Sequence, residues 1–457
     1  MHVLSRKAYL VLLAGDISIL YLSVWVTLTL RHFRTPDIDL AIAHLTSFSF
    51  LFSVWFIIYF LSGLYGRYTV LFRKKLPNII FVAQTINVGV AALLFFSIPF
   101  FQITPKTILV IYLLVSTALL YFWRVYMYPN ILVRKEIGAV LVGTSLELSE
   151  LSEEVNRDPL YPLEFRAIIH PELSSDEEIK KTLSILIESG SVSTIVADAN
   201  SHSLDNILPY IYELTFIKKS AEFIEVRSLY QEVFERVPIS LISDRWLLNN
   251  VNVVSHRVYD ALKRVVDVVA SLVLGVVAIA ISPFVAFAIK MEDGGPALIK
   301  QRRIGRHAKE VVLYKFRSMT GSDDGIWIDR DGSNGINRVT KVGQFLRKTR
   351  IDELPQLWNV LKGDISLVGP RPDIVGLYEA LVETVPFYKL RYAVAPGLTG
   401  WAQTAQVYED GNSSPQSIRE TRMRLQYDLY YVQNRSLLLD ARIIFKTFKV
   451  VLTKLGS

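Results

Sequence analysis

The sequence contains no cysteine among its 457 residues. Disulfide bonds, thiolate metal sites and a cysteine nucleophile are therefore excluded. It also lacks a recognised nucleic-acid-binding motif, although a formal net charge of +7 and a pI near 9.2 make the chain basic. We therefore expect no nucleic acid as a partner. The positive charge instead suits a protein that works beside anionic lipid or on phosphorylated substrates.

Apolar residues are abundant, at 51% of the chain, with a mean hydropathy of +0.32. Four apolar runs fill the first 130 residues, at about 9–30, 44–66, 79–101 and 107–128. Each reaches roughly the 20 residues that cross a ~30 Å hydrocarbon core. The runs lack the polar faces of soluble helices, and the first lacks the cleavage site of a signal peptide. Residues 1–130 are therefore predicted to form a four-helix transmembrane bundle.

Basic residues predict the orientation of this bundle. They gather before the first run, in the second loop and after the fourth run, as Arg6, Lys7, Arg67, Arg73, Lys74, Lys75, Arg134 and Lys135. The first loop offsets its arginines with two aspartates, and the third loop offers a single lysine. The positive-inside rule then places both ends of the bundle in the cytoplasm.

Residues 131–255 show a different pattern, in which short apolar strands such as "GAVLV" and "STIVA" alternate with helical segments. Such alternation is typical of a parallel α/β domain. Gly138 and Gly143 are the only glycines near the first predicted turn, so the G-x-G-x-x-G fingerprint of dinucleotide sites is absent. A structural or regulatory Rossmann-like module is therefore favoured over an NAD site.

A further apolar segment, Lys263 to Lys290, is interrupted by Ser282-Pro283. Proline removes a backbone donor and clashes with the preceding turn, so we expect a kink or a break there. Lys263 and Arg264 precede the segment, and basic residues also follow it. Positive charge on both sides favours a helix that enters the membrane and turns back, while a straight fifth span is the alternative.

The stretch "RIDELPQLWNVLKGD" places two acids, Asp352 and Glu353, directly before an apolar helical pattern. Pro355 is tolerated only in a first turn, so the helix is predicted to begin near Asp352 and to end at Lys362-Gly363. The positive end of a helix favours ionised carboxylates, which can act as a nucleophile or bind Mg²⁺. The alternative is that Asp352 only caps the helix.

Cationic residues surrounding this motif in the sequence favour the chemical interpretation. We expect phosphate-binding charge from Lys315, Arg317, Arg338, Lys341, Arg347 and Arg371, the last held between Pro370 and Pro372. Acids, a divalent cation and arginines together indicate phosphoryl chemistry.

From about residue 263 onward the chain resembles the bacterial sugar transferases known as monotopic phosphoglycosyl transferases. The resemblance lies in "KRVVDVVASLVLGVVAIAISPF", "KQRRIG", "YKFRSM", "IDELPQLWNVLKGDISLVGPRP", "PGLTGWAQ" and "YDLYYVQNRSLLLD". With its N-terminal spans, the whole chain looks like the large polyprenyl-phosphate hexose-1-phosphate transferases. The resemblance implies three parts: a transmembrane bundle at 1–130, a degenerate Rossmann-like α/β domain at 131–255, and a mainly helical transferase domain at 256–457 with a re-entrant helix at about 263–290 and an amphipathic tail.

The resemblance also implies a reaction in the bacterial inner membrane, with the catalytic domain on its cytoplasmic face. A UDP-sugar would give its sugar-1-phosphate to undecaprenyl phosphate, releasing UMP, as the first membrane step of exopolysaccharide, capsule or O-antigen synthesis. In the family the aspartate of the Asp-Glu pair is the nucleophile, which corresponds to Asp352 here, while Glu353 helps to hold Mg²⁺. Ser282-Pro283 corresponds to the breaking point of the family's re-entrant helix, and Lys263 and Arg264 anchor the start of that helix.

This sequence departs from the family at Ala395, since members often carry a basic residue immediately before "PGLTGWAQ". Lys389 and Arg391 lie nearby as candidate substitutes. Asp428 matches a recurring family acid, for which a salt bridge and a site role are both open.

Two other functions are considered. A membrane-anchored nucleotide-sugar epimerase or dehydratase could use the Tyr-x-x-x-Lys spacing of Tyr259 and Lys263, although the glycine fingerprint is missing. The second alternative is a non-catalytic scaffold for polysaccharide assembly, which would not need the Asp-Glu pair. The sequence does not identify the sugar that is transferred. It is also compatible with a homodimer.

Overall fold

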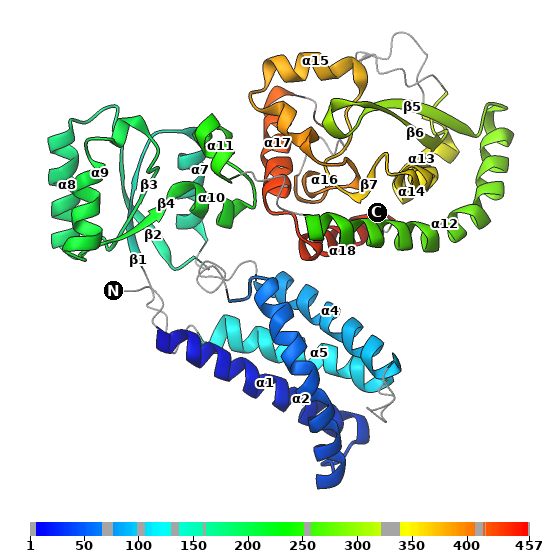
Figure 1. The fold of residues 1–457 in the computed structure, drawn as a ribbon, viewed down its shortest axis with the longest axis horizontal. Coiled ribbons are helices and arrows are strands. Elements are labelled where there is room, and N and C mark those ends of the chain that lie inside the picture. The colour runs from blue at the N-terminus through cyan, green and yellow to red at the C-terminus, as the bar shows by residue number, and fades with distance from the viewer. Residues whose placement is uncertain are drawn as a thin grey trace. The chain divides into compact units, whose positions relative to one another are not determined.

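The computed structural model describes residues 6–65, 76–97, 106–128, 137–158, 161–250, 257–320, 339–406, 415 and 417–455. The chain forms two compact units, Met1–Phe234 and Glu235–Ser457 (Figure 1). The sequence places its second boundary at 255. The contacts instead join 235–250 to the C-terminal unit, because Val237 and Trp246 belong to one apolar cluster with Leu425.

Four long apolar helices form the first part of the N-terminal unit. They are α1 (Arg6–His32), α2 (Ile38–Leu61), α4 (Leu76–Ser97) and α5 (Lys106–Phe122), and α5 continues into the π-helix η3 (Trp123–Met127). Each is long and apolar enough to cross a membrane. Phe48, Trp55 and Tyr112 stack in their shared core with ring centroids 5.1–6.1 Å apart. The basic segments 66–75 and 129–136, on which the predicted orientation depends, lie outside the described residues.

A charged pair is buried within this bundle. The carboxylate of Asp16 accepts hydrogen bonds from the guanidinium of Arg124 and from Tyr65 Oη, the latter at 2.7 Å. Arg124 also donates to the carbonyl of Leu64 at 2.7 Å. Desolvation makes either charge alone costly, so the pair and its added hydrogen bonds fix how α1 and η3 meet.

A small parallel sheet follows, as the alternating pattern predicts. Its strands β1 (Ile137–Val142), β2 (Leu163–Ile169), β3 (Thr194–Ala197) and β4 (Glu222–Glu225) lie in the order β2-β1-β3-β4. The intervening helices are α7 (Leu146–Arg157), α8 (Asp176–Glu188), α9 (Leu208–Tyr212) with the π-helix η5 (Glu213–Ile217), and α10 (Val226–Phe234), together with the 3-10 turn η4 (His202–Leu204). Ser175 starts α8 with a capping box to Glu178, which satisfies two backbone donors.

The two glycines near the first turn of this sheet serve close packing. A Cβ on Gly138 would lie 2.0 Å from the carbonyl oxygen of Ser191, and one on Gly143 would lie 2.6 Å from the side chain of Leu148. Close packing therefore explains why glycine occupies both positions, without a bound ligand.

The C-terminal unit is mainly helical, with two small two-stranded sheets. Its elements are η6 (Ile239–Leu241), α11 (Asp244–Asn250), α12 (Arg257–Asp293), β5 (Leu298–Ile304), η7 (Arg306–Ala308), β6 (Glu310–Phe316), α13 (Lys341–Thr349), η8 (Ile351–Gln356), α14 (Leu357–Lys362), β7 (Ser366–Val368), α15 (Val375–Thr384), η9 (Tyr388–Ala393), β8 (Gly397–Thr399), α16 (Trp401–Ala405), α17 (Ile418–Gln433) and α18 (Leu437–Leu455). Strands β5 and β6 form an antiparallel hairpin, and β7 pairs with β8 in parallel.

Helix α12 is one continuous helix of 37 residues that runs through Pro283. Of the two outcomes expected at Pro283, a kink or a break, the break is absent. Figure 1 shows that the ribbon of α12 changes direction along its length. Ser282 Oγ donates to the carbonyl of Ala278 at 2.6 Å, one of the local adjustments that accompany proline in a helix. Only 6% of the most apolar stretch of α12 is buried within the protein. Most of this stretch therefore presents exposed apolar surface.

Helix α18, the amphipathic tail, packs against its own unit. Ile443 is fully buried in the same cluster as Val360 and Trp401, and Lys446 Nζ lies 4.0 Å from the ring centroid of Trp401. Phe448 stays 60% exposed on the helix. The inner face of this tail therefore packs against the C-terminal unit.

Candidate active site

The Asp-Glu pair lies on a short 3-10 helix, η8, that leads directly into α14. Arg350 precedes it in the left-handed region, with φ of 60°, and so separates η8 from α13. Helix α14 ends at Gly363, whose φ of 90° is the left-handed cap that the sequence predicts. Arg350, rather than Asp352, occupies the N-cap position of η8, which contradicts the capping alternative for the aspartate.

Glu353 is 7% exposed and surrounded by cations from three segments. Its Oε1 lies 3.2 Å from Lys315 Nζ on β6, 3.4 Å from Arg350 Nη1 and 3.5 Å from Arg371 Nη1. Burial alone would raise the pKa of Glu353, but these three cations outweigh it and lower that pKa to about 2. Burial lowers the pKa of Lys315, and this effect exceeds the opposite effect of the nearby negative charge of Glu353, which raises that pKa.

Asp352 differs from its neighbour in its pairing and in the direction in which its pKa is shifted. It is 6% exposed, and its Oδ1 has no hydrogen-bond partner among the described residues. Burial, with a contribution from the charge of Glu353, raises the pKa of Asp352. Desolvation and the charge of Glu353 thus oppose the ionised form of Asp352, in the opposite direction to the effect that the sequence predicts from the helix end.

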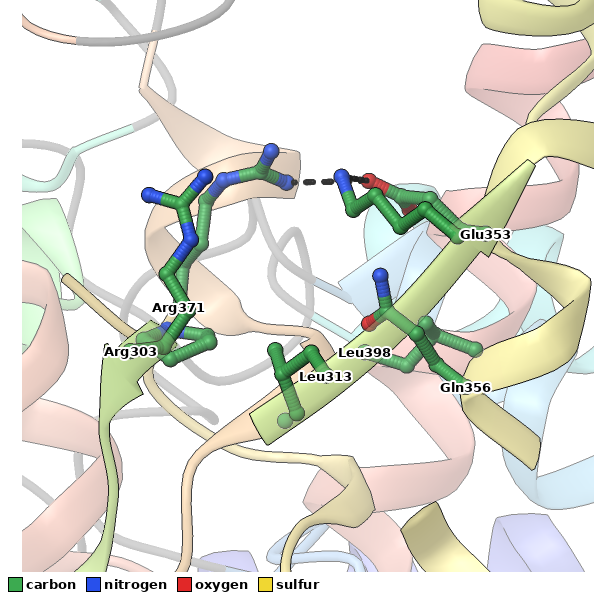
Figure 2. A pocket seen from close by; sticks show the side chains of 9 residues that line it. Arg303, Leu313, Glu353, Gln356, Arg371 and Leu398 are labelled. Atoms are coloured by element: carbon green, nitrogen blue, oxygen red, sulfur yellow. Dashed lines mark hydrogen bonds and ion pairs between the residues drawn. The ribbon is translucent and has the colours of Figure 1, made fainter. Parts of the chain in front are cut away.

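A small pocket opens beside Glu353, which lines it, whereas Asp352 is not among its lining residues. Figure 2 shows Arg303 and Arg371 across this pocket from Glu353, with Gln356, Leu313 and Leu398 nearby. Lys315, Pro372 and Gly397 also line it. The lining combines one buried carboxylate with several cationic donors, and these cations suit an anionic phosphate ligand.

The other predicted site residues fall into different places. Arg347 acts electrostatically on Asp352, while Arg317 pairs with Asp293 and donates to the carbonyl of Met319. Lys341 begins α13, and its backbone N–H donates to Glu292. Arg338 lies outside the described residues.

The Pro370-Arg371-Pro372 segment is held by a buried ionic cluster, defined here as Asp373, Arg391, Arg424 and Asp428. Arg391 and Arg424 each donate to the carbonyl oxygen of Arg371, at 2.8 and 2.7 Å. Asp373 accepts from both arginines, and Asp428 accepts from Arg391 Nε at 3.0 Å. The backbone of Arg371 is therefore positioned by side chains of η9 and α17.

This cluster also answers two questions that the sequence left open. Asp428 is 1% exposed and forms a salt bridge with Arg391, so its role is structural pairing. Arg391 is committed to that cluster and Lys389 is exposed, and neither lines the pocket. Neither residue substitutes in this pocket for a basic side chain at Ala395.

Lys263 and Arg264, predicted as membrane anchors of α12, make contacts inside the unit. Lys263 Nζ lies 2.8 Å from Asp440, and Arg264 donates to the carbonyls of Val360 and Leu361 at 2.6 Å each. Tyr259 also donates to Asp440, at 2.9 Å. The Tyr-x-x-x-Lys pair is thus tied to one carboxylate, which argues against its use in hydride transfer.

Arg303, Arg350 and Gln356 belong to this site although the sequence did not single them out for it. Arg303 was read as part of a basic membrane flank, yet a strand at 298–304 places it on the same face as the buried Gln301. Arg350 adjoins the acids in the sequence, but only its left-handed backbone and the fold bring its guanidinium back to Glu353.

The residues present fit a magnesium ion. Oδ1 of Asp352 is a buried carboxylate oxygen without a described partner, and Glu353 supplies a second carboxylate beside it. Among the described residues no group of three acids or histidines forms a larger cage. Mg²⁺ is commonly held by one or two carboxylates together with substrate phosphates, so this small donor set is sufficient.

Comparison with known proteins identifies the family to which the C-terminal region is similar. The model of the family described as bacterial sugar transferase matches residues 258–454. The chain is 40% identical over 206 residues to a UDP-N-acetylgalactosamine-undecaprenyl-phosphate N-acetylgalactosaminephosphotransferase of Aeromonas hydrophila, covering 44% of this chain and 46% of that relative. It is 39% identical over 211 residues to a UDP-glucose:undecaprenyl-phosphate glucose-1-phosphate transferase of Klebsiella pneumoniae, covering 45% and 42%.

These two matches span less than half the length of each relative. A shorter relative is covered almost completely. The exopolysaccharide production protein PSS of Rhizobium leguminosarum bv. phaseoli is 42% identical over 200 residues, which is 42% of this chain and 96% of that protein. The matched region contains the acids, the pocket and the buried ionic cluster, and the chain belongs to the bacterial sugar transferase family.

Proposed function

We propose that this protein transfers a sugar-1-phosphate from a UDP-sugar to undecaprenyl phosphate, giving an undecaprenyl-diphospho-sugar and UMP. The names of the relatives support the two substrates. The observation that carries the proposal is the contrast within the pair: Asp352 keeps an unpaired buried oxygen, while Glu353 is held ionised by three cations.

In the first step, a carboxylate oxygen of Asp352 attacks the phosphorus that bears the sugar. A bond forms between this oxygen and phosphorus, and the bond to the bridging oxygen breaks, so that UMP leaves with the electron pair. In the second step, a phosphate oxygen of undecaprenyl phosphate attacks the same phosphorus and releases the Asp352 carboxylate. A buried carboxylate with a raised pKa is poorly solvated, which favours it as a nucleophile.

The remaining residues manage charge. Arg371, Arg303 and Lys315 line the pocket where a diphosphate would bind, and arginine suits bidentate phosphate contacts. Glu353 pairs with two of these cations, Lys315 at 3.2 Å and Arg371 at 3.5 Å. Asp352 and Glu353 would hold Mg²⁺, which supplies further neutralisation of the diphosphate charge.

We further propose the membrane arrangement that the sequence predicts. The four N-terminal helices would span the bacterial inner membrane, and α12 would enter the membrane and return at its bend, since its exposed apolar surface needs a lipid environment. The parallel sheet would form a Rossmann-like module, and the transferase unit would lie on the cytoplasmic face, where UDP-sugars are available. This step would begin exopolysaccharide, capsule or O-antigen synthesis.

The experiment is to incubate the purified full chain with Mg²⁺ and a panel of UDP-sugars, with and without undecaprenyl phosphate. We expect UMP release that depends on Mg²⁺ and on the acceptor for continued turnover. Without acceptor, intact-protein mass spectrometry should show one added sugar-phosphate, located on Asp352 by peptide mapping.

Asp352→Asn should give neither the adduct nor UMP release, while its expression and membrane insertion match the parent chain. UMP release without any adduct would contradict the covalent mechanism but not the transfer reaction. Absence of turnover with every sugar tested would contradict the transfer reaction itself, and the panel otherwise identifies the sugar.

A further inference from the structure

A second cavity, of about 260 Å³, opens at the start of α12. Its lining includes the cations Lys263, Arg264, Arg306 and Arg435 and the acids Asp260 and Asp267. None of the residues that line the pocket beside Glu353 is among them. The cavity is therefore separate from the candidate active site.

The charges around this cavity do not balance. Arg435 pairs with Asp260 at 3.2 Å and Lys263 with Asp440 at 2.8 Å, whereas Asp267 accepts a backbone hydrogen bond from Leu367. Counting Asp440, three carboxylates oppose four cations, which leaves one positive charge uncompensated. Among the described residues, neither Arg264 nor Arg306 has a carboxylate partner.

Arg306 is the accessible member of this set. It is exposed and begins the tight turn between β5 and β6, in which His307 and Ala308 both adopt left-handed backbone conformations. Such a turn matches the twist of an antiparallel hairpin, and Arg306 at its start lines the cavity. Arg264, by contrast, already uses two donors on the carbonyls that end α14.

The cavity lies where the bare apolar surface of α12 begins. Its four α12 residues occupy positions 260, 263, 264 and 267, one face of the first turns. The outward residues just beyond are apolar and exposed, with Val265 at 60%, Val269 at 55% and Val273 at 65%. If this surface meets lipid, the cavity is level with the phosphate headgroups.

We propose that this cavity binds the anionic phosphodiester headgroup of a membrane phospholipid. One uncompensated positive charge matches the single negative charge of a phosphodiester. The volume falls just below the roughly 300–1,000 Å³ of pockets that enclose whole ligands, which suits a headgroup and not a nucleotide sugar. The inference rests on the membrane association proposed above and is independent of the transfer reaction.

The test measures lipid retention by native mass spectrometry of the full chain purified in detergent with equal phosphatidylglycerol and phosphatidylcholine. We expect preferential retention of phosphatidylglycerol. Arg306→Gln should weaken that retention about tenfold, the effect of losing one charge-assisted hydrogen bond. The matched control is Lys309→Gln, which removes an exposed cation from the same hairpin outside the cavity and should change retention less than twofold.

Three results would overturn the proposal. Equal effects of the two substitutions, or no effect of either, would mean that the cavity does not select the headgroup. Arg306-dependent binding of inorganic phosphate in the absence of phosphatidylglycerol would assign the cavity to a soluble anion. An Arg306→Gln effect on undecaprenyl phosphate but not on phosphatidylglycerol would assign it to the lipid acceptor.

Asp352→Asn separates this inference from the proposed function. That chain should retain phosphatidylglycerol like the parent, whether or not the parent transfers a sugar phosphate. Loss of retention in Asp352→Asn would place lipid binding in the active site and contradict a separate cavity.

Discussion

Two groups of acids and cations lie in the C-terminal unit, and they differ in how completely they are paired. In the buried ionic cluster, Asp373 accepts from Arg391, Arg424, Tyr388 and Tyr392, so both of its oxygens are satisfied. In the acid pair, Glu353 forms ion pairs with Lys315 and Arg371, but Oδ1 of Asp352 has no partner among the described residues. Complete pairing marks a structural role, whereas an unpaired buried oxygen marks a group available for chemistry.

The two groups are linked through one residue. The carbonyl of Arg371 is held by Arg391 and Arg424, while its guanidinium lies 3.5 Å from Glu353. The cluster can therefore influence the pocket without touching a ligand. The predictions below separate these roles by comparing loss of activity with loss of stability.

The largest effect is expected at the unpaired acid. Asp352→Asn should lower the rate of UMP release by about 10⁴-fold or more, because it removes the proposed nucleophile. Its unfolding temperature should equal or exceed that of the parent, since burial and Glu353 raise the pKa of Asp352 and so make its charged form costly. Steady-state kinetics and thermal unfolding in detergent provide both measurements.

Asp373→Asn is the matched comparison, because it makes the same change in the fully paired cluster. We expect it to lower the unfolding temperature clearly. If instead Asp352→Asn were the more destabilising of the two, the distinction between the groups would be wrong.

The second effect concerns the cluster itself. Arg391 is 1% exposed, and Arg391→Ala would leave Asp373 and Asp428 with Arg424 as their remaining cation. Breaking a buried ion pair in this way typically costs about 3–5 kcal/mol of unfolding free energy. Denaturant unfolding of the purified chain would measure it. Lys389→Ala, an exposed control two residues away, should stay within about 0.5 kcal/mol of the parent.

The third effect is a pH dependence that belongs to Glu353. Its pKa is lowered from near 4.5 to about 2, so its stabilising contribution is complete above pH 4.5 and is lost as the pH falls toward 2. Over this window the parent should lose about 3 kcal/mol more than Glu353→Gln does. Thermal unfolding at stepped pH checks this, with the exposed Glu379→Gln as a control that should keep the parent's slope.

The smallest effect tests the link through Arg371. Arg424→Lys keeps the charge but loses the planar guanidinium, whose Nη2 donates to Arg371 and Asp373 while its Nε lies 3.8 Å from Asp428. If Arg424 positions Arg371, KM for the UDP-sugar should rise about tenfold while kcat stays within about threefold. Arg419→Lys, an exposed change on the same helix, should leave both constants unaltered. Reduced stability with an unchanged KM would assign Arg424 a structural role alone.

Local patterns predicted much of this architecture. The apolar runs gave four long helices, and the alternation of strands and helices gave a parallel sheet. Lys362-Gly363 marked the end of α14 correctly, because a left-handed cap depends on one residue. Of the kink or break expected at Pro283, the break did not form, because the helix continues through the proline.

The pocket was only partly foreseeable. Lys315 and Arg371 were singled out and do meet Glu353, whereas Arg317 turned to Asp293. Arg303 and Gln356 were missed, because their place beside the acids depends on the register of β5 and on the turn between η8 and α14.

The sequence by itself determined the segments, the family and the pair of acids, because periodicity, apolar length and motif spacing are local properties of a chain. Only the tertiary structure decided which acid keeps a free oxygen, which arginines are committed to structure, and where an uncompensated charge remains. Those outcomes depend on burial and on partners far away in the sequence, 177 residues in the case of Lys263 and Asp440. Distances across a fold are set by packing, which no single segment encodes.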